Sequence, residues 1–172
     1  ITGPSGSGKS KLTNKLGELL QDSIILKTDS YYRDNMSIRL FSIFQNDIYD
    51  RLISIKKNEI NNTIRSIYNK DKVVEFYHYD FMRQHSSKSN IIINYNNDSQ
   101  FLIIEGIFSH RLDLNYNETI NILCEEEKRI CLRRRLKRDK LERGRNNKEV
   151  KNKFDRSWNL FYLNIKNYLN VN

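Results

Sequence analysis

The first ten residues, ITGPSGSGKS, combine residue types that bind phosphate. They fit the spacing G-x-x-x-x-G-K-[ST], with Gly3, Gly8, Lys9 and Ser10 at the defining positions. Glycines let the backbone adopt positive φ and turn successive N–H groups towards an anion, the lysine places a cation on the β and γ phosphates, and the serine hydroxyl can bind Mg²⁺. We therefore expect a nucleotide contact from this loop, made by Gly3, Ser5, Gly6, Ser7, Gly8, Lys9, Ser10 and Lys11.

Two acidic residues follow apolar runs further along the chain. Asp29 comes after the run Ile24 to Leu26, and Glu105 ends FLIIE. A single aspartate after a strand is usually a helix cap or a turn former. Beside a phosphate-binding loop, however, Mg²⁺ needs hard oxygen ligands in addition to Ser10, and a hydroxyl that attacks phosphorus needs a carboxylate to take its proton. The two acids are therefore candidates for these tasks.

The pattern of apolar runs predicts elements that would position these groups. Buried parallel strands are indicated at 24–26, 101–106 and 119–124, because short apolar runs end there in polar residues. Helices are expected directly after the loop and over 46–68, 125–142 and 148–168, the third of them ended by Gly144. Strands at 72–81 and 90–95 are read as a small antiparallel pair. This alternation predicts one three-layer α/β domain over residues 1–172.

The net charge of +9 comes from one segment of the chain. Between Lys128 and Lys148 there are 11 basic residues against Asp139 and Glu142, whereas the remaining residues balance at 19 against 19. A protein that coats nucleic acid usually spreads its positive charge over a face. One basic segment therefore favours a compact, highly charged small ligand over nucleic acid.

Other features set bounds on location and chemistry. No run approaches the roughly 20 apolar residues of a membrane span, and there is no leader pattern, so we expect a cytoplasmic protein without membrane contact. Cys124 and Cys131 lack the spacing of zinc ligands and are expected to be reduced, half-buried thiols. Only Ile1 and Thr2 precede the loop, which predicts that the sequence begins within a strand.

Five ordered segments resemble the uridine kinase (uridine–cytidine kinase) family. They are GPSGSGKS, TDSYYRD, YDF from Tyr79 to Phe81, EGI from Glu105 to Ile107, and RRLKRDKLERGR from Arg134 to Arg145. The resemblance implies an α/β P-loop NTPase, nucleoside kinase-like three-layer fold with a parallel sheet, a small β-hairpin and a helical arginine-rich lid. It further implies ATP or GTP as phosphate donor, Mg²⁺, and phosphorylation of the ribose 5′-hydroxyl of a pyrimidine nucleoside. The end of the chain, IKNYLNVN, resembles the start of the family's final strand.

The resemblance also assigns roles to single residues. Asp29 would accept the 5′-hydroxyl proton and hold Mg²⁺ together with Ser10 and Glu105, and Lys9, Arg138 and Arg143 would complete the catalytic set. Tyr32 and Tyr79 would line the nucleoside site. Four arginines of the lid would reach the triphosphate or the sugar: Arg135, Arg138, Arg143 and Arg145.

The chain departs from the family pattern on the acceptor side. The family carries a segment like FDHPDAFD, whose first aspartate binds the ribose hydroxyls, and here IFQNDIYD places Phe44 at that position and Asp47 nearest to it. The histidine expected after YDF is His85, one residue late, with Gln84 in its usual place. A kinase for another small acceptor, such as a sugar phosphate or pantothenate, and a non-catalytic nucleotide-binding regulator or nucleic-acid-binding module therefore remain alternatives. A homo-oligomer is left open.

Overall fold

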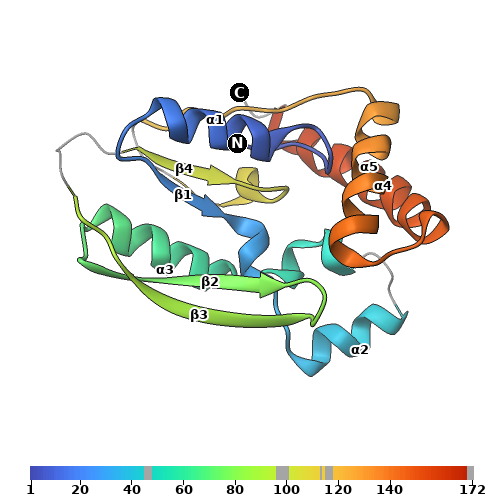
Figure 1. Ribbon diagram of the computed structural model, residues 1–172, viewed down its shortest axis with the longest axis horizontal. Helices are drawn as coiled ribbons and strands as arrows, with labels where there is room; N and C mark the ends of the chain where they lie inside the picture. The colour runs from blue at the N-terminus through green and yellow to red at the C-terminus, as the bar shows by residue number, and fades with distance from the viewer. Residues whose placement is uncertain (45–47, 96–100, 113, 115–117, 170–172) are drawn as a thin grey trace.

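Two short parallel strands lie at the centre of the protein, which we describe from a computed structural model covering residues 1–44, 48–95, 101–112, 114 and 118–169 (Figure 1). Strand β1 (Ile24–Lys27) pairs with β4 (Leu102–Glu105), with Ile24 opposite Leu102 and Lys27 opposite Glu105. The strands form here because their apolar residues are buried between layers. Their carboxyl ends therefore meet at one edge, where Glu105 ends β4 and Asp29 follows β1.

The residues before the phosphate loop extend this arrangement on the far side of β4. The Ile1 carbonyl accepts a hydrogen bond from the Gly106 N–H at 3.2 Å, and Thr2 forms a parallel bridge to Leu123. The strand expected at 119–124 was therefore wrong in length, because this segment makes a single bridge. The segment that pairs with it, residues 1–2, turns into the phosphate loop at Gly3, so the two segments cannot form further backbone pairs. The segment order across the layer is β1, β4, residues 1–2 and residues 122–124.

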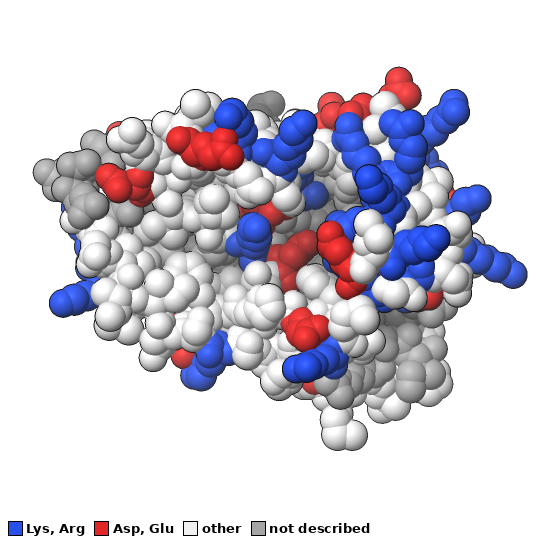
Figure 2. All heavy atoms as spheres, viewed as in Figure 1, with Lys and Arg blue, Asp and Glu red and all other residues white. Residues whose placement is uncertain are grey.

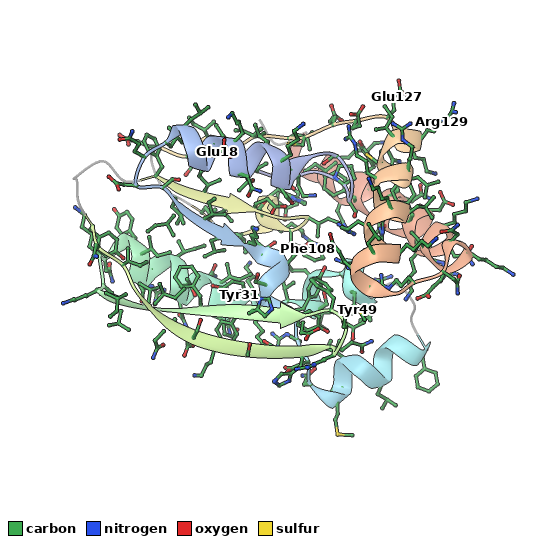
Figure 3. All side chains as sticks on the ribbon, viewed as in Figure 1. Glu18, Tyr31, Tyr49, Phe108, Glu127 and Arg129 are labelled. Carbon is green, nitrogen blue, oxygen red and sulfur yellow. The ribbon has the colours of Figure 1, made fainter. Side chains whose placement is uncertain are left out.

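Helices and a hairpin cover the two faces of this layer (Figure 1). Helix α1 (Lys9–Leu19) lies along one face, and helix α3 (Lys57–Tyr68) and the hairpin lie on the other. The core on the second side joins Leu26 of β1 to Ile60 and Ile64 of α3 and to Phe108. Figure 3 shows Tyr31 and Phe108 inside this side of the molecule. The parallel strands with helices on both faces confirm the expected α/β class.

The helix expected over 46–68 was wrong in its first half. From residue 48 on, where the structure describes this segment, helical structure before Lys57 is limited to the 3₁₀ turns η2 (Ile48–Asp50) and η3 (Leu52–Ser54), and α3 begins at Lys57. The reason is tertiary: the Ser54 carbonyl accepts from the Arg33 N–H at 2.7 Å, and the Lys56 N–H donates to the Tyr31 carbonyl at 2.8 Å. Because these backbone groups pair with another segment, they cannot form the hydrogen bonds of a helix. Helix α2 (Met36–Phe44) was not predicted.

The expected antiparallel pair is a hairpin with different bounds. Strand β2 (Val73–Asp80) pairs with β3 (His85–Ile92), so the second strand begins five residues before the expected position 90. The turn is held by the Asp80 carboxylate, which accepts backbone bonds from Met82 and Arg83 at 2.8 and 3.0 Å. The polar start of β3 is exposed and carries no apolar alternation, so its sequence did not indicate a strand.

The basic segment forms helix α4 (Lys128–Arg143), which packs against α5 (Asn147–Leu169). Gly144 ends α4 with φ 61°, as expected for a left-handed cap. Helix α5 contributes Val150, Phe154 and Phe161 to the interior. In Figure 3, Glu127 and Arg129 mark the outward end of α4. Both cysteines are free, but Cys131 is fully buried, so the expectation of a half-buried thiol was wrong for it.

Candidate active site

The glycine-rich loop runs from Gly3 to Gly8 and leads directly into α1. Gly6 and Gly8 adopt positive φ of 89° and 99°, a region in which side chains are disfavoured. A Cβ on Gly6 would lie 2.5 Å from the Cys131 carbonyl oxygen, so the loop contacts the first turn of α4 there. Since α1 begins at Lys9, its positive N-terminal end faces the same side as the loop. The loop conformation is suited to binding an anion.

Lys9 and Glu105 are buried charged side chains beside the loop. Lys9 is 8% exposed, and its Nζ donates to the Pro4 carbonyl at 3.1 Å. Burial lowers the pKa of Lys9, while the negative charges of Asp29 and Glu105 act in the opposite direction. Burial, followed by the charge of Asp29, raises the pKa of Glu105. An anion near Lys9 and a cation near Glu105 would therefore both be stabilised electrostatically.

Asp29 lies where β1 passes into the 3₁₀ turn η1 (Thr28–Tyr31). Its Oδ1 is buried and has no hydrogen-bond partner within the described part of the chain. Gly106 allows this approach, because a Cβ there would overlap the Thr28 hydroxyl and lie 3.5 Å from Asp29 Oδ1. A buried carboxylate oxygen without a partner is costly unless a ligand binds it. Asp29 is therefore available to a metal ion or to a hydroxyl.

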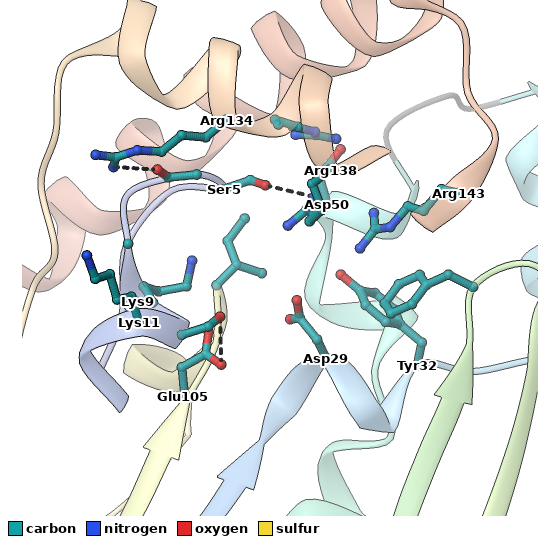
Figure 4. Close-up of a pocket in the computed structure, with 16 residues that line it drawn as sticks. Ser5, Lys9, Lys11, Asp29, Tyr32, Asp50, Glu105, Arg134, Arg138 and Arg143 are labelled. Atoms are coloured by element: carbon teal, nitrogen blue, oxygen red, sulfur yellow. Dashed lines mark hydrogen bonds between the residues drawn. The ribbon is translucent and has the colours of Figure 1, made fainter. Parts of the chain in front are cut away.

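The loop side of the site has donor atoms that suit Mg²⁺. Ser10 Oγ donates to Glu105 Oε2 at 3.4 Å, and Figure 4 shows Asp29 and Glu105 rising from neighbouring strands. Among residues the structure describes, no cluster of three or more His, Cys, Asp or Glu could hold a metal alone. Mg²⁺ usually takes one or two carboxylates and completes its octahedron with phosphate oxygens and water. Ser10, Glu105 and Asp29 fit that requirement.

Arginines of α4 close the opposite side of the loop (Figure 4). Arg138 Nη2 donates to Ser5 Oγ at 3.3 Å, and Arg134 Nη1 donates to the Gly6 carbonyl at 3.1 Å. Figure 2 shows the wider pattern: Lys and Arg side chains gather over α4 and α5, and acidic side chains lie in the central hollow. The helix thus brings cations to the loop through direct contacts.

Asp139 organises these arginines from inside. It has no exposed surface, and its carboxylate lies within 4.0 Å of four guanidinium groups: Arg135 at 3.5 Å, Arg138 at 2.8 Å, Arg143 at 3.8 Å and Arg145 at 3.3 Å. Burial alone would raise the pKa of Asp139, but the surrounding guanidinium charges hold it below its ordinary value. One carboxylate leaves this cluster with excess positive charge, which favours binding of a polyanion.

The loop, the acids Asp29 and Glu105 and several arginines of α4 line a cavity of about 290 Å³, which we call the phosphate cavity. Six basic side chains and three acidic ones face it, so its charge balance favours an anionic ligand. Its lining residues are Ser5, Gly6, Gly8, Lys9, Ser10, Lys11, Asp29, Tyr32, Asp50, Phe81, Glu105, Ile107, Arg134, Arg135, Arg138 and Arg143.

A second cavity of about 80 Å³, which we call the aromatic cavity, adjoins the first. Tyr32 lines it, and the centroid of its ring lies 5.5 Å from that of Tyr79 and 5.8 Å from that of Phe81. Burial, followed by the charges of Asp29 and Asp50, raises the pKa of Tyr32 well above its usual value, so it stays a neutral donor. Arg143 stacks 4.0 Å above the Phe81 ring. Five residues line both cavities: Tyr32, Asp50, Phe81, Arg135 and Arg143.

The residues singled out from the sequence fall into three groups. Most of them line the phosphate cavity, and Tyr79 and Arg145 line the aromatic cavity. Gly3 and Ser7 belong to the loop but line neither cavity. His85 also lines neither; its Nδ1 lies 3.1 Å from Asp34 Oδ2, and Gln84 faces the aromatic cavity instead. Asp47 lies outside the described residues.

Sequence reasoning missed several residues of the site. Asp50 and Phe81 line both cavities, Arg134 contacts the loop, and Asp139 holds the arginines. A signal existed for Asp139, which is the first acid in the basic helix that begins at Lys128. Phe81 belongs to the quoted YDF segment. Nothing in the local pattern distinguished Asp50 from the other polar residues around it.

Comparison with known proteins identifies the family. No curated protein matches the chain. Within the described residues, no helix is long and apolar enough to cross a membrane. The Phosphoribulokinase / Uridine kinase family model matches residues 1–169. The loop, the two strand-end acids and the arginine helix thus lie in a chain that belongs to this family of P-loop kinases.

Proposed function

We propose that this kinase transfers the γ-phosphate of ATP or GTP to the 5′-hydroxyl of a pyrimidine nucleoside, uridine or cytidine. The observation that carries this proposal is the place of Asp29. Asp29 lines a cavity that also contains the phosphate loop, Tyr32 and Phe81, and its Oδ1 is buried without a hydrogen-bond partner among the described residues. A carboxylate between a nucleotide site and an aromatic site can take a proton from an acceptor hydroxyl. The aromatic rings suit a planar base.

The transfer follows from this arrangement. The acceptor oxygen forms a bond to the γ-phosphorus while its proton passes to Asp29, and the bond between that phosphorus and the β–γ bridging oxygen breaks, leaving the nucleoside diphosphate. Lys9 and the α4 arginines offset the charge that develops on the phosphoryl oxygens. Mg²⁺, when bound by Ser10, Glu105 and Asp29, would neutralise charge on the β- and γ-phosphates.

The basic helix is proposed to act as a lid. Arg134 and Arg138 already contact the loop through side-chain bonds to Gly6 and Ser5, and Arg143 lies over Phe81. A bound triphosphate would offer these guanidinium groups stronger, charge-assisted partners than a neutral carbonyl or hydroxyl. Closure of the lid would then exclude water from the γ-phosphate, because water could otherwise hydrolyse the nucleotide.

A phosphorylated sugar is a second candidate acceptor. The aromatic cavity is lined by four cationic side chains: Arg135, Arg143, Arg145 and Lys153. An acceptor with its own phosphate would find compensating charge there. This candidate keeps the same donor, metal and base, and it differs only in the molecule that fills the aromatic cavity.

An acceptor panel tests the proposal directly. Production of ADP is measured by a coupled assay with uridine, cytidine, a purine nucleoside, ribulose 5-phosphate and pantothenate, each at several concentrations. We expect turnover with uridine or cytidine and none with the others. Turnover only with the sugar phosphate would support the second candidate. Nucleotide binding without turnover of any nucleoside would contradict the proposed function.

A further inference from the structure

We propose that Asp34 and Lys56 are positioning residues for the acceptor, because they hold the end of the hairpin, residues 79–86, against the aromatic cavity. This inference rests on the proposed function, which places the acceptor in that cavity, and deepens it by naming what fixes one wall of the acceptor site. Asp34 and Lys56 themselves line neither cavity. Their effect on the acceptor would therefore pass through the hairpin.

The end of the hairpin supplies part of the lining of the aromatic cavity. Tyr79, Phe81 and Gln84 all line it. In the register of the hairpin, Tyr79 lies opposite Ser86. The Tyr79 ring contacts those of Tyr32 and Phe81, with centroids 5.5 and 5.1 Å apart. A displacement of Ser86 would therefore move Tyr79 and alter the wall that faces the acceptor.

Strand β3 gains little support from burial. It lies on the side of β2 away from α3 (Figure 1), and every one of its residues except Ser86 is exposed. A two-stranded hairpin without a buried apolar face is only marginally stable by itself. The half-buried Ser86 is therefore the point at which contacts from outside the hairpin can fix β3.

Two charged side chains contact Ser86 directly. The Ser86 N–H donates to Asp34 Oδ2 at 2.9 Å, and Lys56 Nζ donates to Ser86 Oγ at 2.7 Å. Lys56 Nζ also lies 3.7 Å from Asp34 Oδ1 and 4.7 Å from the ring centroid of Tyr77 in β2. His85 Nδ1 lies 3.1 Å from Asp34 Oδ2, on a side chain that is largely exposed. We call Asp34, Lys56 and Ser86 the hairpin clamp.

The backbone that carries the clamp is fixed on both sides. The Arg33 N–H donates to the Ser54 carbonyl at 2.7 Å, and the Lys56 N–H donates to the Tyr31 carbonyl at 2.8 Å. Tyr31 belongs to the same 3₁₀ turn, η1, as Asp29. The clamp therefore connects the hairpin to the turn that carries the proposed proton acceptor. Groups held in a fixed arrangement around the reacting atoms raise the rate of reaction.

The charges of the clamp strengthen it. Burial acts to raise the pKa of Asp34, but the Ser86 N–H and the charge of Lys56 outweigh burial and hold this pKa below its ordinary value. Asp34 is therefore ionised at neutral pH. The side chains of Lys56 and Asp34 are only 18% and 23% exposed, so solvent screens their contact less than that of a surface pair. Hydrogen bonds with ionised partners are also stronger than neutral ones.

A purely stabilising ion pair is the alternative explanation for Asp34 and Lys56. Loss of such a pair would lower the free energy of unfolding, and the folded protein would keep its kinetic constants for both substrates. Loss of a positioning contact would instead reduce kcat/KM for the acceptor and leave the KM for ATP unchanged, because the phosphate cavity takes no residue from β3. The kinetic constants for the two substrates therefore separate the two roles.

The first test measures steady-state kinetics of Asp34→Asn with uridine, cytidine and ATP. The amide can accept a hydrogen bond from Ser86 only by presenting its NH₂ group to the Lys56 ammonium, so the clamp should open. We expect kcat/KM for the nucleoside to fall by about 10- to 100-fold, the cost of a small misplacement, with the KM for ATP unchanged. Asp155→Asn is the matched control, since Asp155 lies on α5, lines neither cavity and pairs with Lys128.

The second test removes the cation of the clamp. Lys56→Met should cause a similar loss for the nucleoside, and Lys56→Arg, which keeps a cationic donor, should recover most of it. Lys88→Met is the matched control, because Lys88 also lies on the hairpin and pairs with Glu75 of β2 at 2.8 Å, but lines neither cavity. Because Asp34 and Lys56 hold the same point, the double variant should lose little more than either single variant.

The outcomes are separable. If the wild type turns over no nucleoside, the proposed function is wrong and this inference falls with it. If the wild type is active and the clamp variants keep its kcat/KM for the nucleoside, or raise both KM values equally, the proposed function stands and the role of the clamp is overturned. Circular dichroism and ATP binding check that the variants fold. Should Asp34→Asn fail to fold, the comparison of Lys56→Met with Lys56→Arg and Lys88→Met decides the question.

Discussion

The two adjoining cavities are built in different ways. The phosphate cavity uses a contiguous loop, the ends of two paired strands and one helix, and its key groups are backbone N–H groups and charges. The aromatic cavity draws Tyr32, Tyr49, Tyr79 and Phe81 from three separate segments of the chain, and the ring of Tyr32 contacts the other three rings.

This difference explains where the chain keeps the family pattern and where it departs from it. A loop that presents backbone donors tolerates few changes, because each glycine conformation is needed for the anion site. A cavity made of side chains can exchange one residue for another at a nearby position, as with Gln84 in place of His85. The phosphate cavity should therefore determine the reaction, and the aromatic cavity should determine the acceptor.

The largest expected effect is in the phosphate cavity, at Asp29. Asp29→Asn removes the proposed proton acceptor without changing the loop, so turnover should fall by about 100- to 10,000-fold. Steady-state kinetics measures this fall, and calorimetry measures nucleotide binding, which should remain nearly intact. Asp155→Asn serves as control. Equal losses of binding and turnover would mean that Asp29 acts in nucleotide binding and not as the proton acceptor.

The next effect concerns the arginine cluster around Asp139, two of whose members, Arg135 and Arg143, line both cavities. Asp139→Asn leaves four guanidinium groups without their common buried counter-ion, so the free energy of unfolding should fall by about 3–5 kcal/mol. Urea denaturation measures it. The matched control is Asp155→Asn, which removes the exposed ion pair between Asp155 and Lys128. It should lower the free energy of unfolding by about 1 kcal/mol or less. Similar losses of unfolding free energy in the two variants would show that the buried cluster stabilises the fold no more than an exposed ion pair does.

A smaller effect is expected from His110, which contacts the residue directly before the phosphate loop. Thr2, directly before the loop, hydrogen-bonds through Oγ1 to His110 Nδ1 at 2.9 Å. Burial, followed by the charge of Arg111, lowers the pKa of His110 from 6.5 to about 4. Since the unfolded chain takes up this proton at higher pH than the folded protein does, stability should fall as pH decreases from 6.5 to about 4, by roughly 1–3 kcal/mol.

Thermal unfolding at several pH values, compared between wild type and His110→Gln, checks this expectation. The variant should lose most of the pH dependence in that interval. His78→Gln, at an exposed position of β2, should leave the dependence in place. An unchanged slope in His110→Gln would assign the acid sensitivity to other groups.

The smallest effect sharpens the comparison on the acceptor side. Tyr32→Phe deletes the hydroxyl that holds the Tyr49 carbonyl, so the acceptor KM should rise by about 2- to 10-fold, the value of one neutral hydrogen bond. The KM for ATP should not change. Tyr95→Phe also deletes a hydroxyl bonded to a backbone carbonyl, that of Asp71, but away from the cavities, and it should alter neither constant. A parallel rise in both KM values would show that the cavities do not act separately.

The sequence alone was sufficient for the family, the α/β class with parallel strands, and the end of α4 at Gly144. These features depend on neighbouring residues: glycine spacing, apolar runs and a left-handed cap. It failed for residues 48–56, where the Ser54 carbonyl pairs with Arg33 and the Lys56 N–H pairs with Tyr31. It also missed the polar strand from His85, because pairing with β2 stabilises it without an apolar pattern.

Within the site, the same division holds. The sequence by itself determined the phosphate loop, because its glycines and Lys9 act through the local backbone they belong to. Only the tertiary structure decided that Asp139 is the centre of four guanidinium groups, that Phe44 faces solvent, and that Asp50 lies at the junction of the cavities. These placements depend on which segments pack together, and packing joins residues that are far apart in the chain.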